Sequence, residues 1–221
     1  MEKYIKVVYD EKLRPYTEYP EHLAGYLMDR FSIHKGARLL DVGCGRGDML
    51  KAFQRADLQV QGLELHDYKS ELLTDKKVDL ANFETDRFPF EDNTFDVVFS
   101  KSVIEHLHNP ENFIKESNRI LKPGGRIITL TPDWQTQIYI FYNDSTHVQP
   151  YTTVGLKNLL SMHDFTGSRA ELFYQLPLVW NMPFLKPLLK PLRVFFPVKK
   201  VNKSGFLRWA RELMILGTGV K

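Results

Sequence analysis

The 221-residue sequence has a single cysteine, Cys44, and almost no excess of charge. One cysteine excludes a disulfide within the chain and gives no support for a cysteine-ligated zinc site. The 30 Lys and Arg residues nearly cancel the 27 Asp and Glu residues, which leaves a formal charge of +3. A charge this small does not indicate a strongly basic nucleic-acid-binding protein.

Long apolar runs are also missing. No stretch approaches the roughly 18 consecutive apolar residues of a membrane-spanning helix. Residues 1–12 are charged throughout and have no apolar core, unlike a secretory signal, so we expect a cytoplasmic protein. With 43% hydrophobic and 26% charged residues, the chain is expected to form a single globular domain over 1–221, preceded by a helical lead-in at 1–35.

Short β-branched runs alternate with helical patterns along the first two thirds of the chain. This alternation predicts βαβ units, and therefore a parallel sheet with helices on both faces. Later segments are predicted as a helix, at 152–163, and as two strands. The predicted strands are 37–42, 60–64, 95–100, 126–131, 169–175 and 211–216, and the earlier helices are 48–56 and 111–121.

A glycine-rich turn, Asp41-Val42-Gly43-Cys44-Gly45-Arg46-Gly47, joins the first strand to the first of these helices. Glycines at such a turn let the backbone approach a ligand, and Glu64 at the end of the next strand can accept hydrogen bonds from both ribose hydroxyls. Asp48 stands where a dinucleotide loop would have its third glycine. Two acids beside the loop disfavour a pyrophosphate and suit S-adenosylmethionine, with its methionine amine near Asp41.

This turn resembles motif I of the class I S-adenosylmethionine-dependent methyltransferases, and specifically the methyltransferase type 11-like group. Four later segments agree with that superfamily in the same order. The resemblance implies a doubly wound, mostly parallel α/β sheet of seven strands, in the order 3-2-1-4-5-7-6 with the seventh strand antiparallel. The matching segments are 82–84, 88–98, 102–107 and 121–126.

The resemblance also implies the cofactor contacts. The ribose and methionine ends would lie against Asp41, Gly43, Cys44, Gly45, Glu64 and Leu65. Cys44 is expected to contribute its backbone and not to act as a nucleophile. Adenine would lie against Asn82 and Phe83, with Asp79 as a rival to Asn82, and Ser100 would border the cofactor at the end of the fourth strand.

Two histidines are candidates for contact with the methyl acceptor. His106 follows the fourth strand and could take a proton from a hydroxyl, although a packing or positioning role is the alternative. His147 resembles the histidine that precedes the fifth helix of the superfamily, where a loop covers the substrate. It is the leading candidate for a base or substrate contact, and the alternative is a loop-fixing histidine. A dedicated base is not required, because orientation alone can accelerate displacement at an activated sulfonium.

We expect no metal in this region. Some ubiquinone-type O-methyltransferases resemble the same stretch and hold a metal with two acids and a histidine. Glu105 and His106 match two of these ligands, but Ser102 stands in the place of the first acid.

A late segment, 176–209, combines basic and apolar side chains and is predicted as an insertion between the last two strands. Basic residues interleaved with bulky apolar ones are typical of segments that bind membrane surfaces. A packed cap with a solvated basic rim is the alternative, and nucleic-acid contact is disfavoured. From Leu172 to Arg211 there is no acid, and the basic residues are Lys186, Lys190, Arg193, Lys199, Lys200, Lys203, Arg208 and Arg211.

The sequence therefore predicts a methyltransferase that O-methylates a small-molecule, glycan or lipid-linked acceptor. The insertion would form a lid peripherally bound to the inner membrane face, with apolar contacts from Trp180, Phe195 and Phe196. The alternative is a nucleoside-binding regulatory or scaffold protein of the same fold without turnover. An intact glycine turn favours cofactor binding in both cases.

Overall fold

The computed structural model describes residues 15–67, 73, 77–195, 208 and 210–221. Its sheet has seven strands in the order β3-β2-β1-β4-β5-β7-β6. β7 runs antiparallel to β5 and β6, and the other pairs are parallel. The predicted strand order and the doubly wound α/β class are confirmed. The strands are β1 (Arg38–Val42), β2 (Gln59–Glu64), β3 (Val78–Leu80), β4 (Phe95–Lys101), β5 (Leu121–Pro132), β6 (Thr166–Phe173) and β7 (Met214–Val220).

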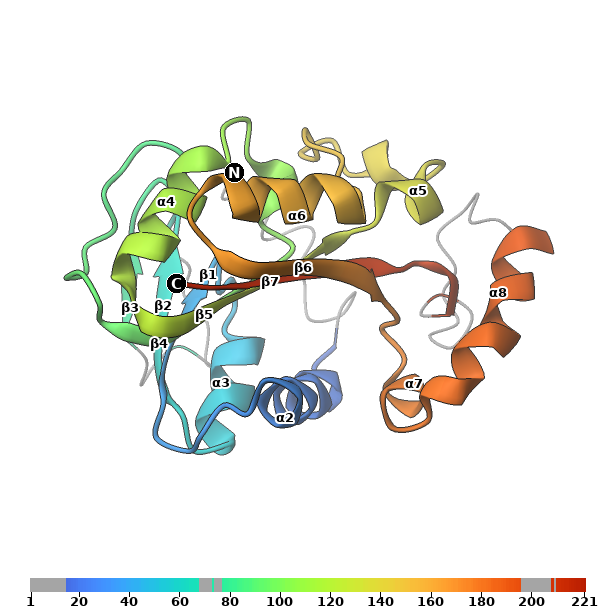
Figure 1. Ribbon diagram of the computed structural model, residues 1–221, viewed down its shortest axis with the longest axis horizontal. Coiled ribbons are helices and arrows are strands. Elements are labelled where there is room, and N and C mark those ends of the chain that lie inside the picture. Colours follow the sequence, from blue (N-terminus) through green and yellow to red (C-terminus); the bar gives the residue numbers. More distant parts are fainter. Residues whose placement is uncertain (1–14, 68–72, 74–76, 196–207, 209) are drawn as a thin grey trace.

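Helices cover both faces of this sheet, as the alternation of strands and helices predicts. α2 (Tyr19–Phe31) and α3 (Asp48–Arg55) pack on one face, through an apolar cluster that includes Leu27 and Phe53. α4 (Glu111–Ile120) and α6 (Thr153–Met162) pack on the other, through a cluster that includes Phe113 and Leu160. Figure 1 shows α4 and α6 above the sheet and α2 and α3 below it.

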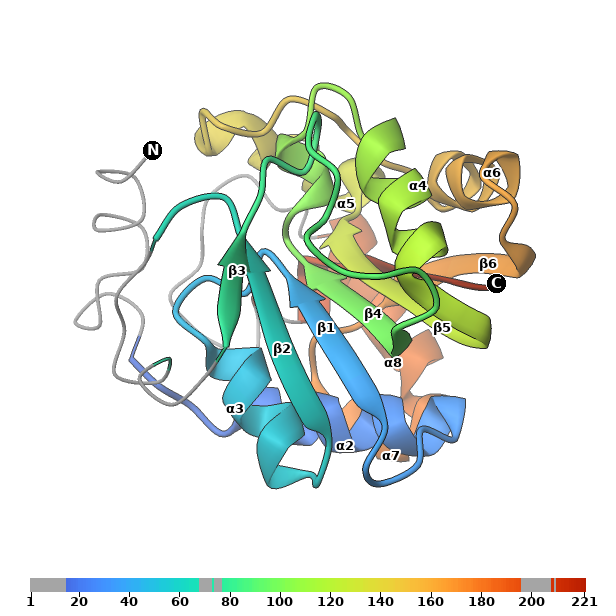
Figure 2. The same cartoon turned by 90° about the vertical axis from the view of Figure 1, so that its left-hand side faces the viewer.

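The parallel strands have their carboxyl ends at one edge of the sheet. The predicted site residues lie at the ends of these strands or in the loops that come after them. Figure 2 shows β3, β2 and β1 side by side with their arrowheads at the same edge. The loop after β1 and the end of β2 meet there, because Gly43 donates its backbone N–H to the carbonyl of Leu63 at 2.7 Å. The side chain of Thr152 caps α6, because it accepts a hydrogen bond from the N–H of Gly155. This cap fixes the point at which the chain turns back from this edge.

Several elements differ from the sequence prediction. β3 is a strand of three residues, too short for its pattern to be recognised. β7 begins at Met214 rather than 211, because Glu212 still donates its N–H to the Arg208 carbonyl in a helical turn. The stretch predicted as a loop after β5 contains two short helices, α5 (Trp134–Gln137) and η3 (Phe141–Asn143).

The insertion between β6 and β7 is helical where it is described. It contains α7 (Pro177–Asn181), η4 (Pro183–Leu185) and α8 (Lys186–Phe195), and Figure 1 shows α8 at the far end of the sheet from β3. Phe196 and most of the basic residues after it lie outside the described residues. No helix in the described ranges is long and apolar enough to cross a membrane.

The expectation that Trp180 is available for membrane contact is wrong. Its ring stacks on Phe173 at 5.4 Å between centroids and lies 5.0 Å from the ring of Tyr26. Its indole N–H donates to the carbonyl of Tyr174 at 2.6 Å. Trp180 therefore anchors α7 to the body of the protein. Phe195, by contrast, is 75% exposed.

Candidate cofactor and methyl-transfer site

The loop between β1 and α3 depends on glycine at positions where other residues would be strained. Gly43, Gly45 and Gly47 have φ values of 73°, 52° and 93°, in the left-handed region. A Cβ at Gly43 would lie 2.3 Å from Cγ2 of Val103. The loop therefore presents bare backbone at the carboxyl edge of the sheet, which is the edge where open α/β sheets bind ligands.

Glu64 holds this loop from the end of β2. Its Oε2 accepts from the N–H of Gly45 and its Oε1 from the N–H of Leu65, each at 2.8 Å. Burial raises the pKa of Glu64, and the two backbone hydrogen bonds oppose part of that rise. A carboxylate can accept about four hydrogen bonds, so Glu64 can keep both backbone donors and still accept from a ribose.

Asp41 is a second buried acid beside the loop, in β1. Burial and the charge of Glu64 raise its pKa well above the usual range, and Lys101 opposes the rise. Two buried acids of this kind, one of which raises the pKa of the other, need positive charge nearby to be ionised at neutral pH. The same burial raises the pKa of the Cys44 thiol, which agrees with a backbone role for that residue.

The side chains that are predicted to contact adenine make hydrogen bonds or packing contacts with other residues of the protein. Asn82 Oδ1 accepts from the N–H of Glu84 at 3.0 Å within its own turn, and the ring of Phe83 lies in the core against Phe88. Asp79 accepts from Gln61 at 2.6 Å. Ser100 is buried and donates its hydroxyl to Thr129 at 2.8 Å. The roles of Asn82, Phe83 and Ser100 toward a cofactor stay predictions.

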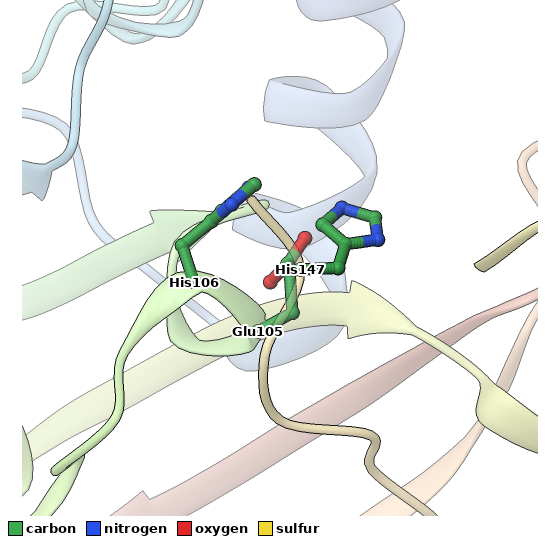
Figure 3. A group of neighbouring side chains, drawn as sticks. All are labelled: Glu105, His106 and His147. Carbon is green, nitrogen blue, oxygen red and sulfur yellow. The ribbon is translucent and has the colours of Figure 1, made fainter. Parts of the chain in front are cut away.

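The two predicted histidines lie together, and a buried acid lies with them. Glu105 and His106 come from η2 (Ile104–His106) after β4, and His147 comes from the loop before α6 (Figure 3). The imidazole centroids are 4.8 Å apart. The two segments are joined by backbone, because Val148 and Gln149 both donate to the carbonyl of Glu105, at 2.9 and 3.0 Å. We call Glu105, His106 and His147 the Glu–His–His cluster.

Hydrogen bonds to protein groups assign the tautomer of both imidazoles. Thr146 Oγ1 donates to the carboxylate of Asp144 at 2.6 Å, so it must accept from Nδ1 of His106, which lies 2.9 Å away. His147 Nδ1 donates to the carbonyl of Phe141 at 2.7 Å. Each ring therefore carries a proton on Nδ1, and in its neutral form has its lone pair on Nε2.

Electrostatics favour neutral groups at this point. Burial and the neighbouring His147 lower the pKa of His106, so its imidazole is a proton acceptor at neutral pH. Burial raises the pKa of Glu105 to about 7. Glu105 Oε2 accepts from Thr131 Oγ1 at 3.0 Å, whereas its Oε1 is buried with no hydrogen-bond partner.

The sequence does not reveal how these groups support one another. It places Glu105 next to His106 but does not predict the complete burial of that acid. It gives no sign that Thr146, Asp144 and Phe141 hold the two rings. One ligand atom from each member of the Glu–His–His cluster lies within 4.8 Å of the others, so the cluster can accept protons or hold a cation.

Comparison with known proteins identifies a methyltransferase domain in the middle of the chain. Residues 40–129 match the family described as "Methyltransferase domain", a range that holds the glycine loop, Glu64 and two members of the Glu–His–His cluster. A demethylmenaquinone methyltransferase of Staphylococcus epidermidis is 31% identical over 130 residues. That match covers 53% of this chain and 54% of the relative, so the chain covers about half the length of such relatives.

Solved structures share the fold over most of the chain. A methyltransferase from Archaeoglobus fulgidus superimposes with a TM-score of 0.68 at 18% identity, covering 97% of this chain and 99% of the other. Phosphoethanolamine N-methyltransferase 2 of Haemonchus contortus, solved with S-adenosylmethionine, gives 0.61 at 18% identity over 90% of this chain and 52% of the other. Residues 40–129 therefore match a methyltransferase domain, and the chain as a whole has the fold of these methyltransferase structures.

Proposed function

We propose that this chain transfers a methyl group from S-adenosylmethionine to an oxygen of a small-molecule acceptor. The observation that carries the proposal is the pair of buried acids, Asp41 and Glu64, beside a loop of bare backbone. A ribose supplies donors for Glu64, and an ammonium and a sulfonium supply the positive charge that two buried acids require. The cofactor therefore relieves the electrostatic cost of burying both acids.

In this proposal the Glu–His–His cluster faces the acceptor. The acceptor hydroxyl gives its proton to Nε2 of an imidazole, preferably that of His147, and its oxygen forms a bond to the methyl carbon. The bond between that carbon and the sulfonium breaks, and S-adenosylhomocysteine leaves with the electron pair on sulfur. The fixed Nδ1 protons orient both rings for this step.

Support for a small-molecule acceptor comes from the relatives. A demethylmenaquinone methyltransferase matches more than half of this chain, and a structural neighbour is a phosphoethanolamine N-methyltransferase. The proposal includes a glycan or lipid-linked acceptor, because a hydroxyl of either would be methylated by the same step.

Calorimetric titration with S-adenosylhomocysteine tests the cofactor site. Wild-type protein should bind one equivalent, and Glu64→Ala should weaken binding at least tenfold because the ribose loses its acceptor. Glu18→Ala is the matched control, since that side chain is 92% exposed and lies at the start of α2. No heat with wild type, or equal affinity in Glu64→Ala, would overturn the site.

A second measurement separates the enzyme from a scaffold protein that binds the nucleoside without turnover. Wild-type protein is incubated with S-adenosylmethionine and a cell extract, and methylated products are identified by mass spectrometry. A product that Glu64→Ala fails to make supports the enzyme. Binding of S-adenosylhomocysteine without any methylated product supports the scaffold.

We propose further that the insertion 176–209 faces the substrate and contacts an anionic membrane surface. The described part exposes apolar side chains next to Lys186 and Lys190, and 172–211 contains no acid to repel anionic lipids. Figure 1 shows α5 at the same end of the sheet as α8, and the turn after α5 and η3 carry further exposed apolar side chains. The exposed residues are Leu178, Met182, Phe184, Leu188 and Phe195 on the insertion, and Ile138, Tyr139 and Tyr142 opposite.

Liposome co-sedimentation tests this contact. Each Lys or Arg near an anionic surface contributes about 1 kcal/mol, and salt screens that attraction over about 10 Å at 0.1 M. The protein should therefore sediment with anionic vesicles at low salt and much less at high salt or with neutral vesicles. Protein that stays in the supernatant with anionic vesicles at low salt supports the packed-cap alternative.

A further inference from the structure

The Glu–His–His cluster unites one carboxylate and two imidazoles from segments about 40 residues apart. One ligand atom from each lies within 4.8 Å of the others, and Figure 3 shows the Glu105 carboxylate between the two rings. We propose that Glu105, His106 and His147 bind a divalent first-row transition-metal ion. The third ligand is then His147, from the loop before α6. An acid at the position of Ser102 is therefore not needed as a ligand.

Each side chain is held in place through one of its two possible ligand atoms, and in the proposed site the other atom binds the ion. His106 is held at Nδ1 by Thr146, and His147 is held at Nδ1 by the carbonyl of Phe141. Glu105 is held at Oε2 by Thr131. Metal-binding histidines in general donate their second ring N–H to a carbonyl or a similar acceptor, which fixes the tautomer and aims the other nitrogen. The cluster shows this pattern at both histidines.

The other carboxylate oxygen of Glu105 indicates that the cluster needs a further partner. Oε1 is buried and has no hydrogen-bond partner, and the whole residue is 0% exposed. A buried carboxylate oxygen without a partner is costly, and proteins ordinarily satisfy such atoms with a donor or a cation. The carboxylate of Asp144, 4.0 Å from Nε2 of His147, adds negative charge beside the same point.

The ligand types indicate which ion is bound. Two imidazoles and one carboxylate suit Zn²⁺ or another first-row ion, whereas Mg²⁺ and Ca²⁺ prefer oxygen ligands. Ligand atoms about 2.1 Å from a tetrahedral ion are about 3.4 Å apart, so the cluster must contract by roughly 1 Å on binding. Three protein ligands leave a position open, as in catalytic zinc sites.

An ion here would change how the acceptor is activated, a consequence that rests on the proposed methyl transfer. A hydroxyl bound at the open position has a lower pKa, so its proton leaves to water instead of to an imidazole. The oxygen then forms the bond to the methyl carbon while the carbon–sulfur bond breaks as before. Metal binding itself does not depend on that reaction.

The experiment uses the full chain after chelator treatment and gel filtration. Calorimetric titration with ZnCl₂ should show one equivalent bound per chain, and MgCl₂ should show no binding at the same concentrations. His147→Ala and Glu105→Gln should each weaken Zn²⁺ binding at least tenfold. His34→Ala is the matched control, because that exposed histidine lies before β1 and should leave the Zn²⁺ affinity unchanged. Substitution by Co²⁺ adds a spectroscopic signature that the His147→Ala protein should lose.

Circular dichroism and titration with S-adenosylhomocysteine show whether each variant is folded. If the His147→Ala and Glu105→Gln proteins both bind Zn²⁺ as tightly as the wild-type protein, the metal site is overturned. If the Glu105→Gln protein does not fold, the partly exposed His147→Ala decides the question. Zn²⁺ binding without S-adenosylhomocysteine binding would overturn the proposed function and leave the metal site standing. The reverse result would overturn the metal site alone.

Discussion

Gly43 combines two separate constraints in one residue. Its φ of 73° is unfavourable for any side chain, and the space that a Cβ would need is occupied by Val103. Val103 belongs to the segment that leads into the Glu–His–His cluster. The glycine loop and the segment that leads into the cluster therefore touch at Gly43.

Gly43→Ala should destabilise the protein by about 1–3 kcal/mol, from backbone strain and overpacking together. It should also lower the affinity for S-adenosylhomocysteine at least tenfold, because the loop must move. Gly124→Ala separates the two causes, since Gly124 has a φ of 80° but nothing within 4 Å of its added Cβ. The Gly124→Ala protein should lose about 1–2 kcal/mol of unfolding free energy and keep the wild-type affinity for S-adenosylhomocysteine. Urea unfolding and calorimetry measure both quantities, and wild-type affinity in Gly43→Ala would contradict the account.

In the proposed reaction Thr146 acts through His106 as a positioning residue. Thr146→Val removes the closer acceptor of Nδ1 of His106, the hydroxyl at 2.9 Å, and leaves only the Thr146 carbonyl at 3.2 Å, so the ring is held less firmly. We expect methyl transfer to fall by roughly tenfold to a hundredfold, because small misplacements of a catalytic group are costly. The affinity for S-adenosylhomocysteine should not change.

Thr146→Ser is the matched variant, since it keeps the hydroxyl, and it should restore most of the rate. Product formation in the extract assay gives the rates, and the pH profile of the reaction provides the second readout. A Thr146→Val enzyme with the wild-type rate and profile would show that the hydrogen bond is merely structural.

The two histidines show what sequence can and cannot reveal at this scale. Each is predicted from its place after a strand or before a helix, and the structure brings the two rings together. Their pairing could not be predicted, because it depends on two backbone hydrogen bonds to the Glu105 carbonyl. Nothing in the composition of residues 144–149 encodes that contact.

At the scale of elements, α4 is tied to the turn before β4 by an ionic network. Arg119 on α4 contacts Glu116 at 2.6 Å and Asp92 at 2.7 Å, and Glu116 also accepts from the N–H of Phe88 at 2.8 Å. Burial raises the pKa of Glu116, but Arg119 and the Phe88 N–H outweigh it, so the net pKa is lowered. This network holds the segment that follows the predicted adenine contacts.

The pKa of Glu116 is lower in the folded state than its value of about 4.3 in the unfolded state. The charge of Glu116 therefore stabilises the fold at pH values above the unfolded-state pKa, and this contribution is lost as the pH falls through the folded-state pKa. Glu116→Gln should therefore cost about 1 kcal/mol of unfolding free energy at pH 6 and much less at pH 3. Urea unfolding at both pH values measures this difference. The exposed Glu91→Gln should change little at either pH, and a cost for Glu116→Gln that stays constant down to pH 3 would contradict the linkage.

Strand prediction succeeds where a strand is buried on both faces. β1, β2 and β4 lie within one residue of their predicted limits, because a short continuous apolar run between turn residues is typical of a strand covered by helices on both sides. β5 extends back to Leu121 through a bulge opposite β4, so the predicted Lys-Pro-Gly-Gly turn lies inside the strand. Pattern alone cannot distinguish such a bulge from a turn, since both use glycine and proline.

At the scale of the whole molecule, the exposed apolar face of η4 and α8 is the feature that needs a partner. Phe184 and Leu188 are 67% and 70% exposed. Replacing both by serine should reduce binding to anionic vesicles at low salt by at least about a hundredfold, because each side chain loses about 1.5–3 kcal/mol of burial if it enters the membrane. Co-sedimentation measures the bound fraction.

Met162→Ser is the control for this prediction, since Met162 is 74% exposed on α6. It should leave vesicle binding unchanged. Equal loss of binding in the control and in the Phe184→Ser, Leu188→Ser protein would show that the attachment is not directed by the insertion.

The register between β6 and β7 has a consequence for how the chain can diversify. Phe173 and Met214 are paired across these two strands, so the excursion 174–213 leaves and re-enters the sheet at neighbouring points. Loop-closure entropy rises slowly with loop length, so an excursion with adjoining ends can be lengthened, shortened or exchanged while the sheet keeps its register. Trp180, packed on Phe173 and Tyr26, covers a patch of the core that any replacement must also cover. The excursion can therefore be exchanged for another one while the sheet is kept, provided that the replacement joins the same strand ends and covers the patch beneath Trp180.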